Sequence, residues 1–262
     1  MHHARKSLAM ALGLGLAFAA ASSSQALTTF ASYAADPSVV QNMSWTNTGF
    51  ASGTLANVAG DADGEAGVTD TRFSFLIGGL PTDLAADFQL NATSTSPAAA
   101  AFGILLVQPG ITGGFSFTYD GPTTTINGVL FTHGANLLSG TFDSVFITGL
   151  DGAGVASAQG ETFTTGPLTF SSDFLVIDNT ADEGLSIALN SILAPLHVKG
   201  PGDALANFRS STLGSFSADS VSMGGGGGVP ETSTWIMILA GFAGLGAVLR
   251  RGKGKVSLSP AI

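Results

Sequence analysis

The chain has no cysteine, and this absence excludes several kinds of site at once. It contains 262 residues, of which none is Cys, four are His, two are Trp and two are Tyr. Disulfides, thiolate metal sites and cysteine nucleophiles are therefore excluded. A folded body must be held together by its hydrophobic core, without covalent cross-links.

Histidine is almost as scarce, which leaves little for acid–base catalysis. His2 and His3 lie at the very start of the chain, so only His133 and His197 remain for a folded body. Both sit among loop-forming residues, and we interpret both as partly exposed structural side chains. A Ser/His/Asp set can be drawn with either of them, but no Gly-x-Ser-x-Gly motif supports one. We therefore expect that the chain is not an enzyme.

Basic residues are rare in the central part of the chain. Between residues 27 and 228, three basic residues stand against seventeen acidic ones, a net charge of −14 compared with −9 for the whole chain. Nucleic acids and anionic membrane surfaces are recognised by clustered Lys and Arg. We therefore expect the body to bind neither. The other six basic residues lie near the two ends of the chain.

A long uncharged run near the C-terminus has the properties of a membrane span. Residues 232–249 carry no charge, and a helix of this length measures about 27 Å, close to the thickness of a bilayer's hydrocarbon core. Arg250 and Arg251 follow directly, and clustered Arg and Lys mark the cytoplasmic side. We predict one transmembrane helix over 232–249, with the body outside and a basic cytoplasmic tail over 253–262. A buried core helix is the alternative.

The same segment carries a family resemblance. Val229, Pro230 and Glu231 precede Trp235 and the apolar run, and the run ends in two arginines. This order resembles the PEP-CTERM sorting signal over residues 229–252, with threonine in place of the usual second proline. The resemblance implies export, membrane retention, and recognition by an exosortase, a membrane protease that processes the chain near the Pro-Glu pair. It also implies a bacterial source that makes extracellular polysaccharide.

The N-terminus predicts export as well. Two basic residues are followed by an apolar stretch over residues 8–21 and then by small residues up to Ala26. This is the layout of a secretory signal peptide and its cleavage site. We expect signal peptidase to remove residues 1–26 and to leave Leu27 as the first residue of the mature chain. An uncleaved membrane anchor is the alternative.

Between these ends, the sequence predicts β-structure over residues 27–222. Short runs such as 72–77, 114–119 and 142–147 alternate apolar and polar residues and end near Gly, Asp, Asn or Pro. Period-two alternation with such boundaries is the signature of strands. We expect an all-β, antiparallel β-sandwich of jelly-roll-like form, followed by a glycine linker over 223–228.

Particular turns can also be predicted. Asp120-Gly121, Asn127-Gly128 and Asp151-Gly152 are dipeptides typical of tight hairpins. Residues 81–90 show no clear alternation at their start, and we expect a turn or short helix there.

One acidic loop offers candidate metal ligands. Asp61, Asp63 and Glu65 alternate in a glycine-containing segment, and oxygen ligands at alternate positions suit Ca²⁺. The EF-hand pattern nevertheless fails where it requires its glycine and its final glutamate. A solvated hairpin loop is the simpler interpretation, and the acidic residues within 178–183 are interpreted as a turn. We expect no cofactor, with calcium as the one ion that the acidic loop could hold.

Two functions of different classes fit these observations. The first is a non-enzymatic surface or matrix protein that acts by adhesion or by association with exopolysaccharide. The second is an exported glycan-active hydrolase that uses an unrecognised Asp/Glu pair, and a cleft with two facing carboxylates would favour it. Only Trp45, Tyr33 and Tyr119 are expected to be available for stacking on sugars, because the many Phe residues belong in the core. We favour the first.

Replacing Pro230 and Glu231 together by alanine should block processing of the tail. Intact-mass measurement of membrane and extracellular fractions should find an unchanged chain released as a form that starts at Leu27 and ends within 229–232. The double variant should stay in the membrane fraction and retain residues 250–262. Normal processing of the variant would remove the exosortase argument.

Overall fold

The alternation of apolar and polar residues makes most described segments strands. Strand β14 (Glu183–Leu193), for example, buries Leu185, Ile187 and Leu189 and exposes Ser186. The named elements are all strands, so the expected all-β class is confirmed. The computed structural model describes residues 27–37, 40–58, 67–101, 103–162 and 166–224. The signal peptide, the acidic loop at 61–65 and the sorting signal, all predicted above, lie outside the described residues.

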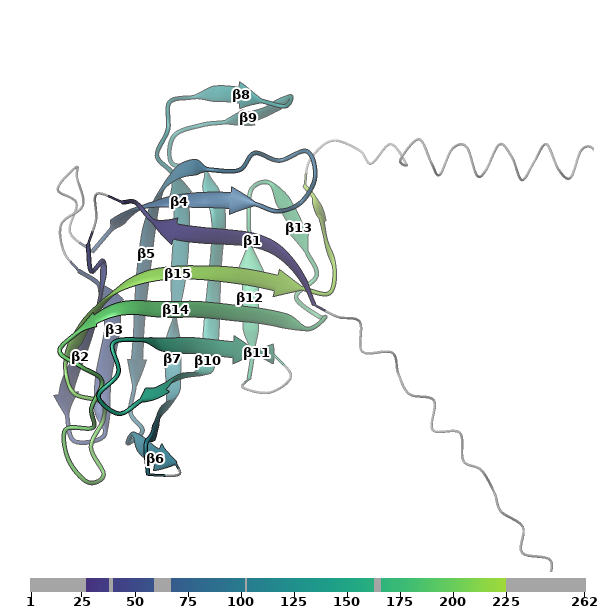
Figure 1. Cartoon of the computed structure of the whole chain (residues 1–262). Helices are drawn as coiled ribbons and strands as arrows, with labels where there is room; N and C mark the ends of the chain where they lie inside the picture. The colour runs from purple at the N-terminus through teal and green to yellow at the C-terminus, as the bar shows by residue number, and fades with distance from the viewer. Residues whose placement is uncertain (1–26, 38–39, 59–66, 102, 163–165, 225–262) are drawn as a thin grey trace, which may run out of the picture.

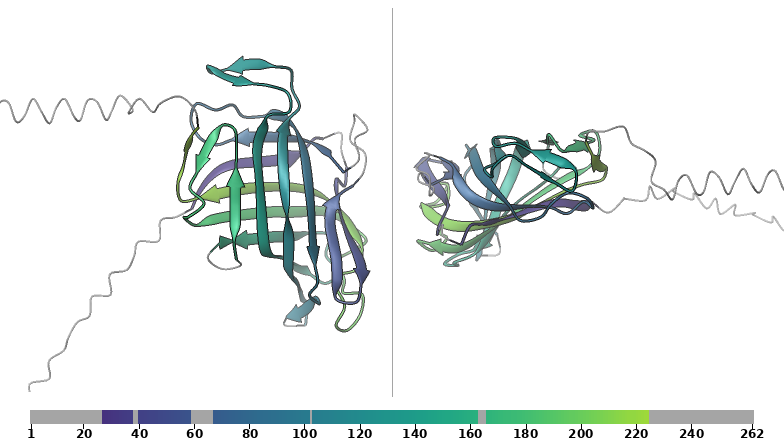
Figure 2. Two further views of the ribbon diagram at one scale, coloured as in Figure 1. Left: turned by 180° about the vertical axis from the view of Figure 1, so that it is seen from behind. Right: turned by 90° about the horizontal axis from the view of Figure 1, so that it is seen from above.

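The strands form two layers that lie across one another, with the core between them (Figures 1 and 2). The front layer of Figure 1 contains β1 (Thr28–Ala35), β4 (Thr69–Phe75), β11 (Ala156–Glu161), β14 and β15 (Phe208–Ala218). The back layer contains β5 (Leu84–Ser94), β7 (Leu105–Tyr119), β10 (Asn136–Leu150) and β12 (Leu168–Ser171). The hairpin of β2 (Met43–Gly49) and β3 (Ser52–Asn57) lies at one side. The shorter strands are β6 (Ala99–Ala101), β8 (Thr124–Ile126), β9 (Val129–Phe131), β13 (Leu175–Ile177) and β16 (Val221–Met223).

The two layers belong to one antiparallel sheet, which closes on itself. Its path runs β1-β4-β5-β7-β10-β11-β14-β15 and returns to β1. The expected sandwich-like arrangement is therefore present, but its layers are joined through strand pairing and are not two separate sheets. A closed path leaves the eight strands within it without a free edge, which protects them from pairing with other chains.

Two buried asparagines lie where β5 and β15 change from one neighbouring strand to another. On β5, pairing switches from β4 to β3 around residues 89 and 90, and Asn57 fills that gap. Its amide nitrogen donates to the Phe88 carbonyl at 3.0 Å, and its oxygen accepts from the Leu90 N–H. On β15, pairing switches from β1 to β2, and Asn42 accepts there from the Thr212 N–H at 3.0 Å. Side chains thus supply the hydrogen bonds that a continuous strand would have made.

The core between the layers is rich in phenylalanine. Phe88 and Phe117 of the back layer stack with ring centroids 4.5 Å apart. Tyr33 of the front layer packs against these two rings at 4.9 and 4.8 Å, and Phe216 lies 5.0 Å from Phe115. Aromatic contacts of this kind add about 0.5–1.5 kcal/mol each to the burial of their area. They join the two layers in a chain that has no disulfide.

A bulge turns β10 from the back layer toward the front layer. The register against β7 shifts between Phe142 and Val145, and Ser144 has a φ of 62°. The Thr112 hydroxyl donates to Asp143 Oδ1 at 2.6 Å across the same place. Bulges bend strands and change the face on which the following side chains appear. Before the bulge β10 pairs with β12, and after it with β11.

Three local expectations are corrected by the structure. Residues 81–90 do not form a helix, because Leu84, Ala86, Phe88 and Leu90 alternate inward as part of β5. Of the three turn dipeptides, only Asn127-Gly128 forms a two-residue hairpin, joining β8 to β9 with positive φ at both residues. The first two residues of the expected glycine linker are paired, since Met223 lies in β16 and the Gly224 N–H donates to the Phe174 carbonyl at 2.7 Å. This bond gives the Phe174 carbonyl a hydrogen-bond partner.

Asn57→Ala should lower the free energy of unfolding by about 2–4 kcal/mol, because it leaves a buried N–H and a buried carbonyl without partners. Urea titration measures the loss. Asn91→Ala on the exposed side of β5 is the matched control and should change stability by less than about 0.5 kcal/mol. Equal effects of the two substitutions would contradict the role given to Asn57.

Candidate functional site

A row of side chains crosses the outer surface of the front layer. Phe146 of β10 is paired with Gln159 of β11. Gln159 is paired with Ser186 of β14, which is paired in turn with Ser215 of β15. Paired residues of antiparallel strands point to the same face, and adjacent strands lie about 4.8 Å apart. The row is therefore on the order of 14 Å long.

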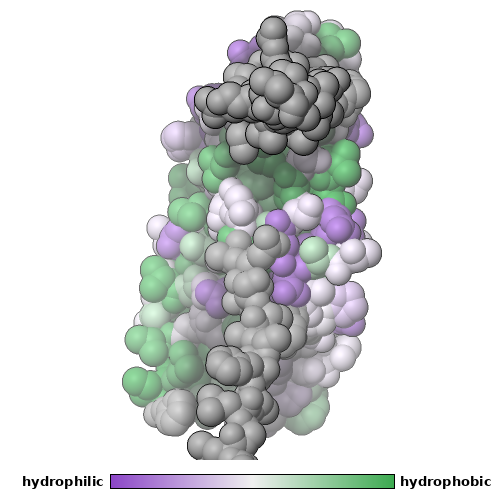
Figure 3. All heavy atoms as spheres, turned by 90° about the vertical axis from the view of Figure 1, so that its right-hand side faces the viewer, coloured by the Kyte–Doolittle hydropathy of each residue, from purple (hydrophilic) through white to green (hydrophobic). Residues whose placement is uncertain are grey.

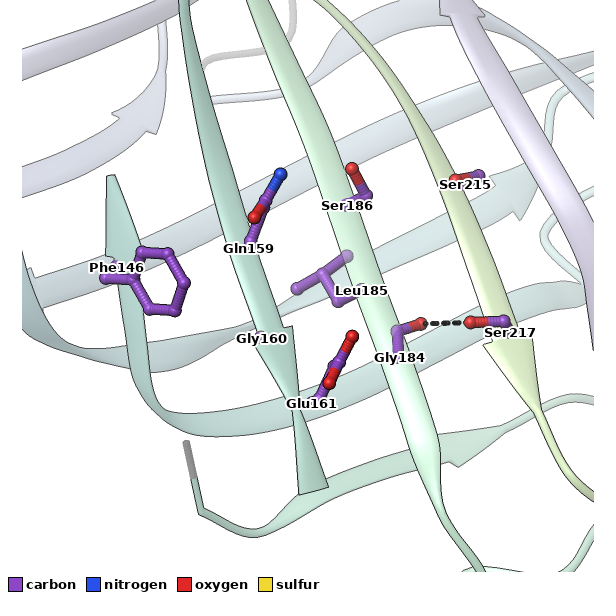
Figure 4. A pocket seen from close by; sticks show the side chains of 9 residues that line it. All are labelled: Phe146, Gln159, Gly160, Glu161, Gly184, Leu185, Ser186, Ser215 and Ser217. Carbon is purple, nitrogen blue, oxygen red and sulfur yellow. Dashed lines mark hydrogen bonds between the residues drawn. The ribbon is translucent and has the colours of Figure 1, made fainter. Parts of the chain in front are cut away.

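A second row beside it contains a glycine and leaves a hollow. Glu161, Gly184 and Ser217 are paired across β11, β14 and β15. A Cβ at Gly184 would lie 2.5 Å from Ser217 Oγ, so a larger residue would fill this space. The hollow has a volume of about 340 Å³ and is shown in Figure 4. We call it the front groove; its lining is Phe146, Gln159, Gly160, Glu161, Gly184, Leu185, Ser186, Ser215 and Ser217.

Most polar side chains of the front groove are free to meet a ligand. Gln159, Ser186 and Ser215 make no side-chain hydrogen bond within the described part of the chain, and Ser217 Oγ is 3.5 Å from the Gly184 carbonyl. The amide and the hydroxyls both donate and accept. Phe146 is only partly buried and adds an aromatic surface at one end of the row. This combination can hydrogen-bond to sugar hydroxyls and contact the apolar face of a sugar ring.

Carboxylates are sparse in the front groove. Glu161 is the single acidic residue in its lining. Glycoside hydrolysis generally requires two carboxyl groups about 5–10 Å apart. Neither a second hollow on the back layer nor a third beside Trp45 and Arg209 adds a carboxylate from the described residues. The described lining therefore offers binding groups but no acid pair.

A buried carboxyl lies directly behind the front groove. Glu183 adjoins Gly184 but points inward, and its side chain is fully buried. Burial raises the pKa of Glu183 to about 7; the nearby Thr162 hydroxyl opposes this rise, and the negative charge of Asp178 adds to it. The proton on this group is therefore held more tightly in the folded than in the unfolded chain.

His133 and His197 lie outside the lining of the front groove. His197 Nδ1 is 2.6 Å from Asp151 Oδ1, and His133 Nδ1 is 3.8 Å from Asp120 Oδ1. Their side chains are 53% and 67% exposed, as expected for surface histidines. No serine or threonine hydroxyl is bonded to either ring among the described residues. The histidines thus form two surface pairs with aspartate and no triad.

Of the predicted signal and metal residues, the structure describes only Leu27. Leu27 immediately precedes β1. The described residues contain no helix long and apolar enough to cross a membrane, and no group of three or more His, Asp or Glu able to hold a metal. Asp178 accepts from the N–H and hydroxyl of Thr180, which lowers the pKa of this carboxyl and identifies the acidic segment after β13 as a turn. The other candidates lie outside the described residues: Ala26, Asp61, Asp63, Glu65, Val229, Pro230, Glu231, Trp235, Arg250 and Arg251.

The expected aromatic residues are not the ones that the surface presents. Trp45, Tyr33 and Tyr119 are buried, and the Trp45 indole N–H donates to the Leu205 carbonyl at 3.0 Å. Phe146 takes their place. Strict alternation from Phe142 would have turned Phe146 inward, but the bulge at Ser144 shifts the strand by one residue. A glycine-free bulge of this kind leaves no recognisable sequence signal.

Comparison with known proteins identifies no relative of this chain. No protein-family model matches it, and neither a curated protein nor a solved structure does.

Glu183→Gln should stabilise the fold at high pH and not at low pH. The pKa of Glu183 is higher in the folded chain than its ordinary value of 4.5, so its ionisation destabilises the fold as the pH rises through about 7. Urea titrations should show a gain of roughly 1–2 kcal/mol at about pH 8 and almost none at about pH 4.

Asp83→Asn is the control for this effect, since it removes a carboxylate that is 75% exposed and lies 3.9 Å from Arg72. Exposed ion pairs contribute little, so this substitution should change stability by less than about 1 kcal/mol at either pH. A loss of stability in Glu183→Gln that is equal at both pH values would show that ionisation of Glu183 is not the cause.

Proposed function

We propose that this chain is an exported protein of the cell surface or extracellular matrix whose β body binds neutral polysaccharide without cleaving it. Its sorting would depend on the PEP-CTERM-like segment, with signal peptidase, an exosortase and the membrane as partners. The observation that carries the binding proposal is the front groove, in which the ring of Phe146 stands beside the Gln159 amide and the hydroxyls of Ser186 and Ser215, which have no hydrogen-bond partner among the described residues.

The layout of the body is compatible with this route. Its described strands begin at Thr28 and end at Met223, and both predicted targeting segments lie outside the described residues. The start of β1 and the yellow-green C-terminal end of the described body lie at the same side in Figures 1 and 2. A membrane tether after Gly224 would therefore leave the surfaces of both layers accessible.

Charge favours a neutral polymer over an acidic one. The body between residues 27 and 228 has three basic residues against seventeen acidic ones, and the described lining of the front groove contains Glu161 but no Lys or Arg. A polyanion would meet repulsion that is not offset by any Lys or Arg in the lining. Hydroxyl groups of a neutral polysaccharide match the donors and acceptors present. The hydrolase alternative would need a second carboxylate opposite Glu161.

Phe146→Ala should weaken binding of the full-length chain to extracellular polysaccharide from the producing cells roughly five- to tenfold, because it removes the aromatic contact. The protein is kept in detergent, and binding is measured on immobilised polysaccharide. Phe50→Ala is the matched control, because Phe50 is 79% exposed and outside the groove. Gln159→Ala tests the amide separately.

Two results would count against the proposal. Absence of binding by the unchanged chain would reject polysaccharide association. Release of reducing sugar ends during the assay, lost in Glu161→Gln, would instead favour the hydrolase.

A further inference from the structure

The outer surface of the back layer carries a second hollow of the same general kind. Gln89 of β5 is paired with Ser116 of β7. Ser116 is paired with Ser139 of β10, which is paired with Ser171 of β12. This row crosses four strands, as the front row does, and it too is on the order of 14 Å long.

A glycine again makes the hollow beside the row. Asn91, Gly114, Thr141 and Thr169 form the neighbouring row. A Cβ at Gly114 would lie 3.0 Å from the Gly140 carbonyl, so a larger residue would fill this space. The hollow has a volume of about 690 Å³, within the range of small-molecule sites. We call it the back groove.

Among the described residues, no ionisable side chain lines the back groove. The amides of Gln89 and Asn91 are exposed and make no hydrogen bond within the described residues. Asn179 forms one wall and is committed to the backbone of Phe170, donating to its carbonyl at 2.9 Å and accepting from its N–H at 2.7 Å. The hydroxyls of Thr141 and Thr169 bond to each other at 2.8 Å, and that of Ser139 accepts from the Asn136 amide at 3.1 Å. The groups left for a ligand are therefore the two amides and the hydroxyls of Ser116 and Ser171, which have no side-chain hydrogen bond among the described residues.

The chemistry of this lining fits one kind of occupant. A stable protein partner would need an apolar centre, but the groove's two aromatic residues, Phe115 and Phe170, are only 6% and 3% exposed. In Figure 3 the half of the molecule toward the back layer is mainly white to purple, whereas hydrophobic residues gather toward the front layer. Nucleic acid and acidic polymers would need cations, which the lining lacks. A neutral polysaccharide, which presents many hydroxyl groups and no charge, fits the polarity of the described lining and its lack of charge.

We propose that the back groove is a second binding site for neutral polysaccharide, so that one body bridges two polymer strands held on opposite layers. This inference rests on the function proposed above, since the front groove holds the first strand. The two layers of a closed β-structure pack about 10 Å apart, so the bridged strands would be held close together. Binding at two faces also raises the apparent affinity for a polymer network through multivalency.

A bridging assay separates the two grooves. Beads coated with extracellular polysaccharide from the producing cells are loaded with the full-length chain in detergent and washed, and fluorescent polysaccharide of the same kind is then added. The unchanged chain should capture fluorescence. The double variant Gln89→Ala/Asn91→Ala should still load onto the beads but capture at least fivefold less fluorescent polymer.

Two control variants show whether a loss of capture comes from the back groove itself or from a damaged fold. Thr93→Ala lies on the same exposed face of β5 but outside the groove and should capture normally. Phe146→Ala should load less well through the front groove. If the double variant captures as much as the unchanged chain, bridging comes from paired copies or from the front groove alone, and the inference is overturned.

The outcomes for the two proposals also differ. If the unchanged chain loads onto the beads but captures no fluorescent polymer, the second site is rejected and the proposed function stands. If it does not load at all, the proposed function fails, and the inference fails with it.

Discussion

Closure of the sheet is the constraint on which the rest of the body depends. The long strands β5 and β15 each change edge partner partway along, and a closed path is possible only if the backbone groups at these gaps are satisfied. Asn42 and Asn57 do this, and Thr69 connects them, accepting from Asn57 at 2.9 Å and donating to the Asn42 carbonyl at 3.5 Å. Buried polar groups without partners are costly. These side chains therefore stabilise the arrangement in which β4 and β3 pair with successive parts of β5, and β2 and β1 with successive parts of β15.

Inside the closed sheet, phenylalanine joins the layers and thereby determines their outer surfaces. Side chains alternate along a strand, so placing Leu185 and Ile187 in the core places Ser186 outside. In the same way, burial of Phe117 turns Ser116 outward. A slip of one residue would exchange the two faces. The aromatic core therefore sets the registers from which both grooves arise, although no core ring is needed to contact a ligand.

The two grooves, described from opposite sides of the body, share an origin in small residues. Glycine at 184 in one groove and at 114 in the other leaves room above the backbone, while neighbouring strands supply hydroxyls and amides. With its described ends at one side, such a body is compatible with the proposed attachment to a membrane and the proposed contact with polymer on two faces. Its acidic composition favours solubility, and a fold without cysteine does not depend on redox state.

The sequence by itself determined the β class, the acidity of the body and the short Asn127-Gly128 hairpin, because these follow from composition and from residues close together in the chain. Its signals for export and sorting stay predictions. Tertiary structure alone decided that the sheet closes, that Trp45 is buried and that Phe146 is not. Those outcomes depend on the pairing of strands far apart in sequence and on a bulge at Ser144, and local alternation contains no information about either. The grooves belong to this second group, since each is formed where side chains from four strands come into register.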